Sequence, residues 1–331
     1  MSAAAPVLDI DRLSVAFQAR GRAASVLNEI SFSLMPGETL CLVGESGCGK
    51  SMTALAIMRL IPETGRISGG TISLRGTDLA ACDETALRRI RGNQVSMIFQ
   101  EPMTALNPVY TVGDQIGESL RLHQQLDKAA ARIRAIDMLR SVGIPAPERR
   151  VDEYPHQLSG GMRQRVMIAI ALACDPHVLI ADEPTTALDV TVQAQIFDLL
   201  REQQERRGTA VLLITHDMGA VAEMADRVVV MYGGRVVEQG AVADILARPA
   251  HPYTRGLIAC LPELDAAPSD TRPDLPEIQG VVPPVWERGA GCPFHDRCTQ
   301  AMPRCTESFP PMFPAGPRHR VACWLHEGAA S

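Results

Sequence analysis

Hydrophobic and polar residues alternate in the first part of the chain, as they do in strands that are buried on one face. The alternating segments are residues 7–10, 13–17, 30–34 and 71–74. Short, continuous apolar runs, which are typical of parallel strands buried on both faces, predict further strands. These runs are residues 40–43, 95–99, 178–181 and 210–215. The pattern therefore predicts an α/β fold with an antiparallel sheet before the first buried strand.

The apolar period changes to that of a helix between Thr111 and Gln157. Apolar residues recur at helical spacing at Val112, Ile116, Leu120, Ile133, Ile136, Leu139 and Val142. Residues spaced by three or four positions share one face of a helix. We therefore expect a helical subdomain of about residues 104–175, packed on the side of the α/β core.

A change of composition after Pro249 indicates a second region. A proline-rich segment, residues 261–284, is followed by four cysteines near the C-terminus. No internal repeat is visible in the sequence. We place the domain boundary near residue 248, which divides the chain into a larger domain, residues 1–248, and an extension, residues 249–331.

The overall composition is that of a globular protein. The chain has 331 residues, of which 46% are hydrophobic and 21% are charged. Its net charge of −6 argues against a nucleic-acid-binding surface. The N-terminus lacks the layout of a secretion signal, and no apolar stretch approaches the ~20 residues that cross a bilayer. We expect a soluble cytosolic protein that reaches a membrane only through a partner.

A glycine-rich loop after the first buried strand is the strongest chemical signal in the chain. It consists of Gly44, Glu45, Ser46, Gly47, Cys48, Gly49, Lys50 and Ser51. The glycines let backbone N–H groups turn toward a phosphate, and the following helix adds the positive end of its dipole. Lys50 can reach the β- and γ-phosphates of a nucleotide, and the Ser51 hydroxyl can ligate Mg²⁺. The alternative is a glycine-rich turn with a chance lysine.

Polar side chains follow three other predicted strands at the points where those strands end. They are Gln100, the adjacent Asp182 and Glu183, and His216. Because ligands of α/β proteins collect at the carboxyl ends of the strands, these side chains are expected to converge. Asp182 can hold Mg²⁺ through water, and Glu183 can polarise the water that attacks a γ-phosphate. Taken singly, Gln100 could be a loop residue or a cap, and His216 a structural histidine.

Two further places could contact a nucleotide. Ser159 suits an N-cap, and Gly160 and Gly161 expose backbone N–H groups at the start of a helix. This makes a second anion-binding helix end, unless the segment is simply a well-capped structural helix. Phe17, in the N-terminal sheet, could stack on a base or could equally be a core phenylalanine.

The nine cysteines fall into two groups. Most of the scattered ones are expected to be small buried hydrophobes, although alkylation of Cys48 within the phosphate loop is expected to block nucleotide binding. The clustered ones are Cys292, Cys298, Cys305 and Cys323. In a reducing compartment such a cluster favours a metal over disulfides. Its loose spacing suits an iron–sulfur cluster better than structural zinc, with zinc and unliganded thiols as the alternatives.

The order of these motifs resembles that of the ATP-binding subunits of ABC transporters. The resemblance covers residues 7–248 and rests on the phosphate loop, Gln100, residues 158–161, Asp182, Glu183, residues 187–189 and His216. The dipeptide and oligopeptide permease ATPases are more similar still. That closer resemblance rests on residues 100–104, 106–108, 181–190 and 251–254 and on the four late cysteines.

The resemblance implies a P-loop NTPase with a RecA-like core, an antiparallel β subdomain, a helical signature subdomain and a small C-terminal extension. It implies hydrolysis of ATP with Mg²⁺, in which Phe17 stacks on adenine, Gln100 senses the metal and the water, and His216 contacts the γ-phosphate. Ser159, Gly160 and Gly161 would contact the ATP that an opposite subunit binds. A [4Fe–4S] cluster in the cysteine tail, or zinc in its place, is implied in the same way.

The implied function is to energise a membrane importer of di- or oligopeptides from the cytoplasmic face of the membrane. The implied partners are a second, related but different ATPase subunit, two transmembrane permease subunits and an extracytoplasmic substrate-binding protein. Nickel or glutathione could be the cargo instead. The rivals are a non-transport ABC ATPase of DNA repair or translation, which usually carries basic arms, and a regulatory module that does not hydrolyse ATP. The intact Glu183 and His216 argue against the regulatory module.

Overall fold

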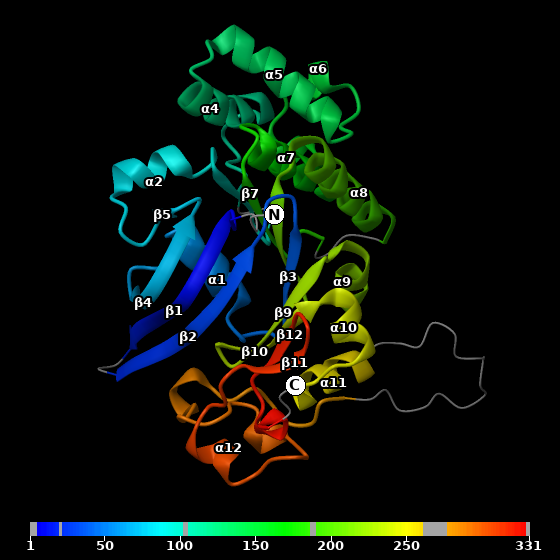
Figure 1. The fold of residues 1–331 in the computed structure, drawn as a ribbon. Helices are drawn as coiled ribbons and strands as arrows, with labels where there is room; N and C mark the ends of the chain where they lie inside the picture. The colour runs from blue at the N-terminus through cyan, green and yellow to red at the C-terminus, as the bar shows by residue number, and fades with distance from the viewer. Residues whose placement is uncertain (1–4, 20–21, 102–104, 186–189, 261–276, 329–331) are drawn as a thin grey trace, which may run out of the picture.

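The computed structural model describes residues 5–19, 22–101, 105–185, 190–260 and 277–328, and these residues form two sheets flanked by helices (Figure 1). The smaller sheet is antiparallel, with the strand order β2-β1-β4-β5. Its strands are β1 (Leu8–Ala19), β2 (Arg22–Leu34), β4 (Gly65–Leu74) and β5 (Thr77–Asp78). Leu8, Ile10, Leu13 and Val15 of β1 are buried, so the alternation in the sequence marks the face that packs on the core.

The larger sheet has eight strands in the order β11-β12-β10-β9-β3-β8-β7-β6. Its parallel part consists of β3 (Thr39–Val43), β6 (Val95–Ile98), β7 (Val178–Asp182), β8 (Ala210–Ile214) and β9 (Arg227–Tyr232). Ile214 pairs with both Leu42 and Asp182, which aligns the carboxyl ends of β3, β8 and β7. The residues that follow these strands therefore lie together at one edge of the sheet.

A group of helices lies beyond that edge, at the top of Figure 1. It comprises α4 (Val112–Gln124), α5 (Lys128–Ser141), α6 (Pro147–Arg150) and α7 (Gly160–Leu172). The expected apolar stripe is wrong at Ile133, which is 65% exposed, because α5 packs through smaller residues such as Ala131 and Ala135. Ala131 lies opposite Gly117 of α4, where the two helices approach closely.

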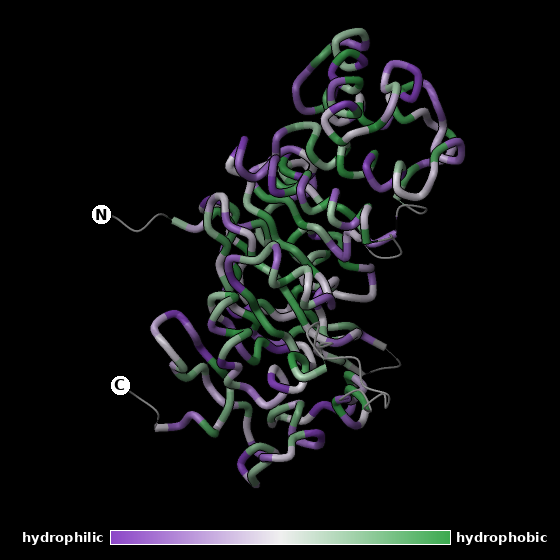
Figure 2. The backbone as a smooth tube through the Cα atoms, turned by 90° about the vertical axis from the view of Figure 1, so that its right-hand side faces the viewer, coloured by the Kyte–Doolittle hydropathy of each residue, from purple (hydrophilic) through white to green (hydrophobic). Residues whose placement is uncertain are grey.

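The remaining helices of the first 248 residues pack around the two sheets. They include α1 (Lys50–Ile57), α2 (Glu84–Ile90), α8 (Val190–Arg207), α9 (Met218–Met224) and α10 (Val242–Ala247), and the short η1 (Pro155–Gln157) precedes α7. Figure 2 shows the hydrophobic residues concentrated through the middle of the molecule, where the strands of the larger sheet run. Among the described residues, no helix has both the length and the hydrophobicity that crossing a bilayer requires.

The C-terminal extension is joined to the larger sheet. Its described elements are α11 (Pro252–Ala259), η2 (Val285–Glu287), η3 (His295–Arg297), α12 (Arg304–Glu307), β11 (Phe313–Gly316), β12 (His319–Val321) and η4 (Trp324–His326). The strand β10 (Arg235–Ala241) precedes it in the larger domain. β12 pairs with β10 through Glu238 and Val321, so the sheet continues across residue 248. The extension therefore shares a sheet with the larger domain and does not form a separate unit.

A buried carboxylate fixes this junction. Glu238 of β10 is fully buried and accepts hydrogen bonds from the backbone N–H groups of Ala250 (2.7 Å) and His251 (2.8 Å). His319 Nε2 of β12 lies 2.6 Å from the same carboxylate. Burying a carboxylate is costly unless it is paired and hydrogen-bonded, so these three partners make the junction specific as well as stable.

Candidate functional site: an ATP site at the carboxyl edge of the sheet

The glycine-rich loop joins β3 to α1 and requires glycine at two positions. Gly44 has φ +150°, and a Cβ there would lie 2.2 Å from the carbonyl oxygen of Met231 on β9. Gly49 has φ +108°, and a Cβ there would lie 2.6 Å from Leu27 Cδ2. Both residues therefore let the loop pass close against neighbouring strands in a backbone conformation that side chains disfavour. α1 then begins at Lys50 with its N-terminus at the loop.

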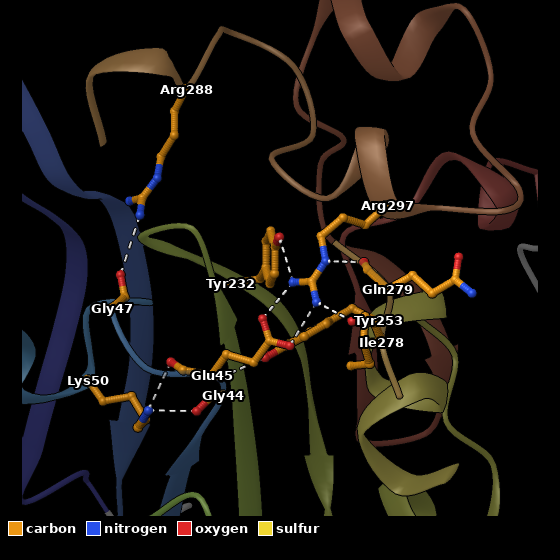
Figure 3. A network of polar contacts seen from close by, with 10 residues as sticks. All are labelled: Gly44, Glu45, Gly47, Lys50, Tyr232, Tyr253, Ile278, Gln279, Arg288 and Arg297. Carbon is orange, nitrogen blue, oxygen red and sulfur yellow. Dashed lines mark hydrogen bonds and ion pairs between the residues drawn. The ribbon is translucent and has the colours of Figure 1, made fainter. Parts of the chain in front are cut away.

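Lys50 lies inside the curve of the loop. Its Nζ donates to the carbonyl oxygens of Gly44 (2.6 Å) and Glu45 (3.2 Å), and the residue is only 6% exposed (Figure 3). A buried ammonium group requires such acceptors because it loses its hydration. These contacts hold the charge at the loop that the sequence predicts to surround a phosphate.

Ser51 and Asp182 form a pair of oxygen donors beside Lys50. Ser51 Oγ donates to Asp182 Oδ1 at 3.1 Å, which joins the start of α1 to the end of β7. Asp182 is 4% exposed, and this burial raises the pKa of its carboxyl group. Hydroxyl and carboxylate oxygens are ligands that Mg²⁺ accepts, so the pair could hold the metal that the sequence predicts here.

Gln100, Glu183 and His216 converge although they follow three different strands. Gln100 Nε2 donates to Glu183 Oε2 at 2.8 Å, and His216 Nδ1 lies 3.1 Å from Glu183 Oε1. Glu183 itself has φ +46°, an uncommon conformation for a side-chain-bearing residue. Strained backbone of this kind clusters at functional sites, where surrounding contacts hold it in place. The structure thus brings together the three side chains for which the sequence predicts a catalytic role.

The second glycine-rich helix end has the predicted cap and an open approach. Ser159 is the N-cap of α7, and its Oγ accepts from the N–H of Met162 at 3.4 Å. A Cβ at Gly160 would meet nothing within 4 Å. Further along α7, Gln164 Nε2 donates to the carbonyl oxygen of Pro184 at 2.5 Å. This bond connects the helix to the segment that follows Glu183.

Phe17 packs against neighbouring side chains rather than standing free. A Cβ added to Gly65 would lie 2.6 Å from the Phe17 ring, and Phe17 joins the cluster around the smaller sheet as a partly buried member. This packing is compatible with the alternative that Phe17 is a core phenylalanine, while stacking on adenine stays a prediction. Two motif segments, residues 102–104 and 186–189, lie outside the described residues.

The four late cysteines line one small cavity with Phe294 and Trp324. The cavity has a volume of about 20 Å³, and its cysteines are Cys292, Cys298, Cys305 and Cys323. Burial raises the pKa of Cys292 to about 12 and raises the pKa values of Cys298 and Cys323 as well. Four cysteines beside one cavity supply the type of ligand that zinc or an iron–sulfur cluster takes. Even so, no group of three or more His, Cys, Asp or Glu side chains in the described part of the chain is arranged to hold a metal ion.

Comparisons with known proteins agree with the motif order. Residues 27–186 match the sequence model of the ABC transporter family, and residues 237–305 match that of the oligopeptide/dipeptide transporter C-terminal region. A Brucella abortus (strain 2308) protein named as a peptide import ATP-binding protein is 51% identical over 96% of this chain and 96% of its own. The chain belongs to the peptide-import family of ABC transporter ATP-binding proteins.

Other members and a solved structure support the family and the fold. The dipeptide transport ATP-binding protein DppD of Bacillus subtilis (strain 168) is 47% identical over 98% of this chain and 96% of its own. The ATP-binding cassette MJ0796, solved as a dimer bound to ADP and Pi, matches 71% of this chain and 98% of its own with a TM-score of 0.65 and 26% identity. The predicted family, ABC-type fold and ATPase activity coupled to transport are thereby confirmed.

Sequence reasoning missed one set of residues at the site. Tyr253 and Arg297 of the extension contact the outer side of the phosphate loop, and Tyr232 of β9 accepts a hydrogen bond from Arg297 (Figure 3). Arg297 lies 252 positions from Glu45, and no local pattern signals such a pair. That alkylation of Cys48 blocks nucleotide binding stays a prediction, but the reaction should be slow, because the side chain is fully buried and burial raises the pKa of its thiol. A buried, protonated thiol is a poor target for alkylation.

Proposed function

We propose that this cassette hydrolyses ATP at the edge formed by β3, β6, β7 and β8 and thereby energises the import of di- or oligopeptides. The observation that carries the assignment of the site is the convergence of Gln100, Glu183 and His216 next to the loop of Lys50. In this arrangement Lys50 and the loop N–H groups bind the β- and γ-phosphates, and Ser51 and Asp182 position Mg²⁺.

Glu183 is the residue that polarises the attacking water. Its two carboxylate oxygens are held by Gln100 and His216, which fixes the direction in which the carboxylate faces. His216 is the more exposed of the pair, with 64% of its side chain accessible against 15% for Glu183, so it can contact the γ-phosphate. Positioned groups of this kind are the main source of catalysis in phosphoryl transfer.

The ATP site is completed by a second subunit. The open approach to Gly160 supports contact of the α7 N-terminus with a ligand that lies outside this chain. The structural relative MJ0796 was solved as a dimer. We infer that Ser159, Gly160 and Gly161 contact the ATP bound by the phosphate loop of a partner ATPase, which the family favours to be a related but different chain.

The membrane partners dock near Gln100. Three exposed apolar residues lie near it in the sequence: Phe99, directly before it, is 39% exposed, and Val109 and Tyr110, after it, are 72% and 55% exposed. Large apolar side chains left exposed near a functional site suit contact with a partner protein. We infer that a transmembrane permease subunit binds this surface, and that the two permease subunits of the complex hold the cassettes at the cytoplasmic face of the membrane. A substrate-binding protein outside the membrane selects the cargo.

We also propose that the four late cysteines hold a metal centre, either a [4Fe–4S] cluster or zinc. The support is that these four residues line one cavity although they are spread over residues 292–323. A bound centre would cross-link the loops of the extension. Elemental analysis of anaerobically purified protein is expected to find iron or zinc, and the absence of both would remove this proposal.

The assignment of Glu183 is tested by Glu183→Gln in the full chain. The variant keeps the shape of the side chain but loses the base, so we expect ATP binding to persist while turnover falls by about 100-fold or more. The ATP-bound variant should also accumulate as a closed dimer on size-exclusion chromatography. The matched control is Glu205→Gln, which changes an exposed residue of α8. Wild-type turnover in Glu183→Gln would overturn the assignment.

A further inference from the structure

The extension reaches the phosphate loop through one arginine. Arg297 of η3 forms a forked ion pair with Glu45, with 2.6 Å from Nη1 to Oε2 and 3.1 Å from Nη2 to Oε1 (Figure 3). The Arg297 side chain is only 7% exposed. A paired fork of this kind is stronger and more directional than a single contact, because the planar guanidinium matches the carboxylate.

Arg297 is itself fixed by three further hydrogen bonds. Its Nε donates to the carbonyl oxygen of Gln279 at 2.8 Å, and its Nη2 donates to that of Ile278 at 2.8 Å. Its Nη1 also donates to Tyr232 Oη at 3.1 Å. The guanidinium therefore has one orientation, and it presents that orientation to Glu45. Such prior fixation makes a contact suited to setting the position of its partner.

Two more contacts from the extension reach the same loop. The N–H of Glu45 donates to Tyr253 Oη of α11 at 2.7 Å, and Arg288 Nη2 donates to the carbonyl oxygen of Gly47 at 3.3 Å. Tyr253 packs edge-on against Tyr232 with ring centroids 4.6 Å apart, and Phe294 packs on both rings. The outer side of the loop is thus held at two positions by a packed aromatic group and two arginines.

The negative charge of Glu45 links these contacts to nucleotide binding. Glu45 lies within the loop that surrounds the phosphates, and a carboxylate near a polyphosphate repels it. Figure 3 shows the Glu45 side chain pointing toward Arg297, with Lys50 on the other side of the loop. Arg297 therefore both neutralises the carboxylate and keeps it turned from the place where Lys50 meets the phosphates.

We propose that Arg297 is a positioning residue for ATP: through Glu45 it holds the phosphate loop in its binding form, so the C-terminal extension sets the nucleotide affinity of the cassette. The inference rests on ATP binding by this loop. It differs from a merely structural brace, which would change the stability of the protein and leave its affinity for ATP unaltered.

The test measures the affinity of the full chain for Mg-ATP with Arg297→Ala. A fluorescent ATP analogue is titrated, and ATP then competes with it. We expect binding to weaken by about fivefold or more, within the usual range of coupling between distinct sites. In steady-state ATPase measurements, KM should rise by a larger factor than kcat falls. The matched control is Arg304→Ala, since Arg304 of the same extension pairs with Glu327 and lies over Trp324, away from the loop.

A double variant separates positioning from bracing. If Arg297 acts by restraining the Glu45 carboxylate, Arg297→Ala combined with Glu45→Gln should bind ATP more tightly than Arg297→Ala alone. Arg297→Lys, which keeps the charge without the fork, should fall between wild type and Arg297→Ala and also serves if the alanine variant misfolds. Equal ATP affinity of Arg297→Ala and Arg304→Ala, or no recovery in the double variant, would overturn the proposal. Failure of the wild-type chain to bind Mg-ATP would instead overturn the proposed function.

Discussion

The inner and outer sides of the phosphate loop are held by different parts of the chain. On the inner side Lys50 contacts carbonyl groups only five and six positions away, at Glu45 and Gly44. On the outer side the contacts come from Tyr253 and Arg297, which are 208 and 252 positions away. The inner side carries the chemistry and is built locally, whereas the outer side sets the position of the loop and depends on the whole fold. Four predictions examine this division.

The largest expected effect concerns the junction between the extension and the larger domain, at Glu238 and His319. His319→Ala removes a partner of the fully buried Glu238 and leaves its carboxylate undercompensated. We expect the free energy of unfolding to fall by about 3–5 kcal/mol, measured by urea denaturation, in one cooperative transition. Arg320→Ala, an exposed neighbour on β12, is the control. A separate early transition of the extension, with the rest unchanged, would show that the outer side is only an appendage.

The inner side is examined by Lys50→Ala. The variant removes a charged donor from the place where two acceptors now hold it. Each hydrogen bond from a charged group contributes about 1.5–3 kcal/mol, so affinity for ATP should fall by about 100-fold. Lys128→Ala at the start of α5 changes the other lysine of the chain and should bind ATP as the wild type does. If Lys50→Ala weakens ATP binding less than Arg297→Ala does, the outer side of the loop contributes more to ATP affinity than the inner side.

The junction should also weaken in acid. Burial lowers the pKa of His251 to about 4, from 6.5 in an exposed chain. Between pH 6.5 and pH 4 the unfolded chain therefore binds a proton at His251 that the native protein does not bind. The free energy of unfolding falls as the pH falls through this range. Between pH 6.5 and 5 the loss should be about 2 kcal/mol, measured by denaturant titration at each pH. His251→Asn should flatten this part of the profile, and an unchanged slope in that variant would contradict the assignment to His251.

The smallest expected effect concerns thiol reactivity on the inner side. Cys48 is fully buried, whereas Cys82, Cys260 and Cys298 are partly accessible, and Cys298 belongs to the cluster proposed to hold a metal. A short treatment with iodoacetamide should label Cys82 and Cys260 first and leave Cys48 essentially unlabelled, as read from peptide masses. Adding Mg-ATP should change the labelling of Cys48 little. Rapid labelling of Cys48 would show that the loop opens readily and is not held from outside.

The sequence by itself determined most of the inner side. Gly44 and Gly49 are required where the backbone passes a neighbouring strand, and Lys50 and Ser51 follow at the start of a helix. Gln100, Glu183 and His216 were predictable as a group, because parallel strands bring their carboxyl ends to one edge. These features depend on local geometry and on the period of apolar residues, which a single sequence displays.

Only the tertiary structure decided the outer side. That Arg297 meets Glu45, that β12 adds to β10 and that four cysteines surround one cavity follow from packing between distant segments. Ile133 shows that the sequence pattern can also mislead for a single residue. Its helical spacing placed it on the buried face, but the packing of α5 left it exposed. Periodicity specifies which faces prefer burial, but the partner of each face is chosen by the arrangement of all the elements together.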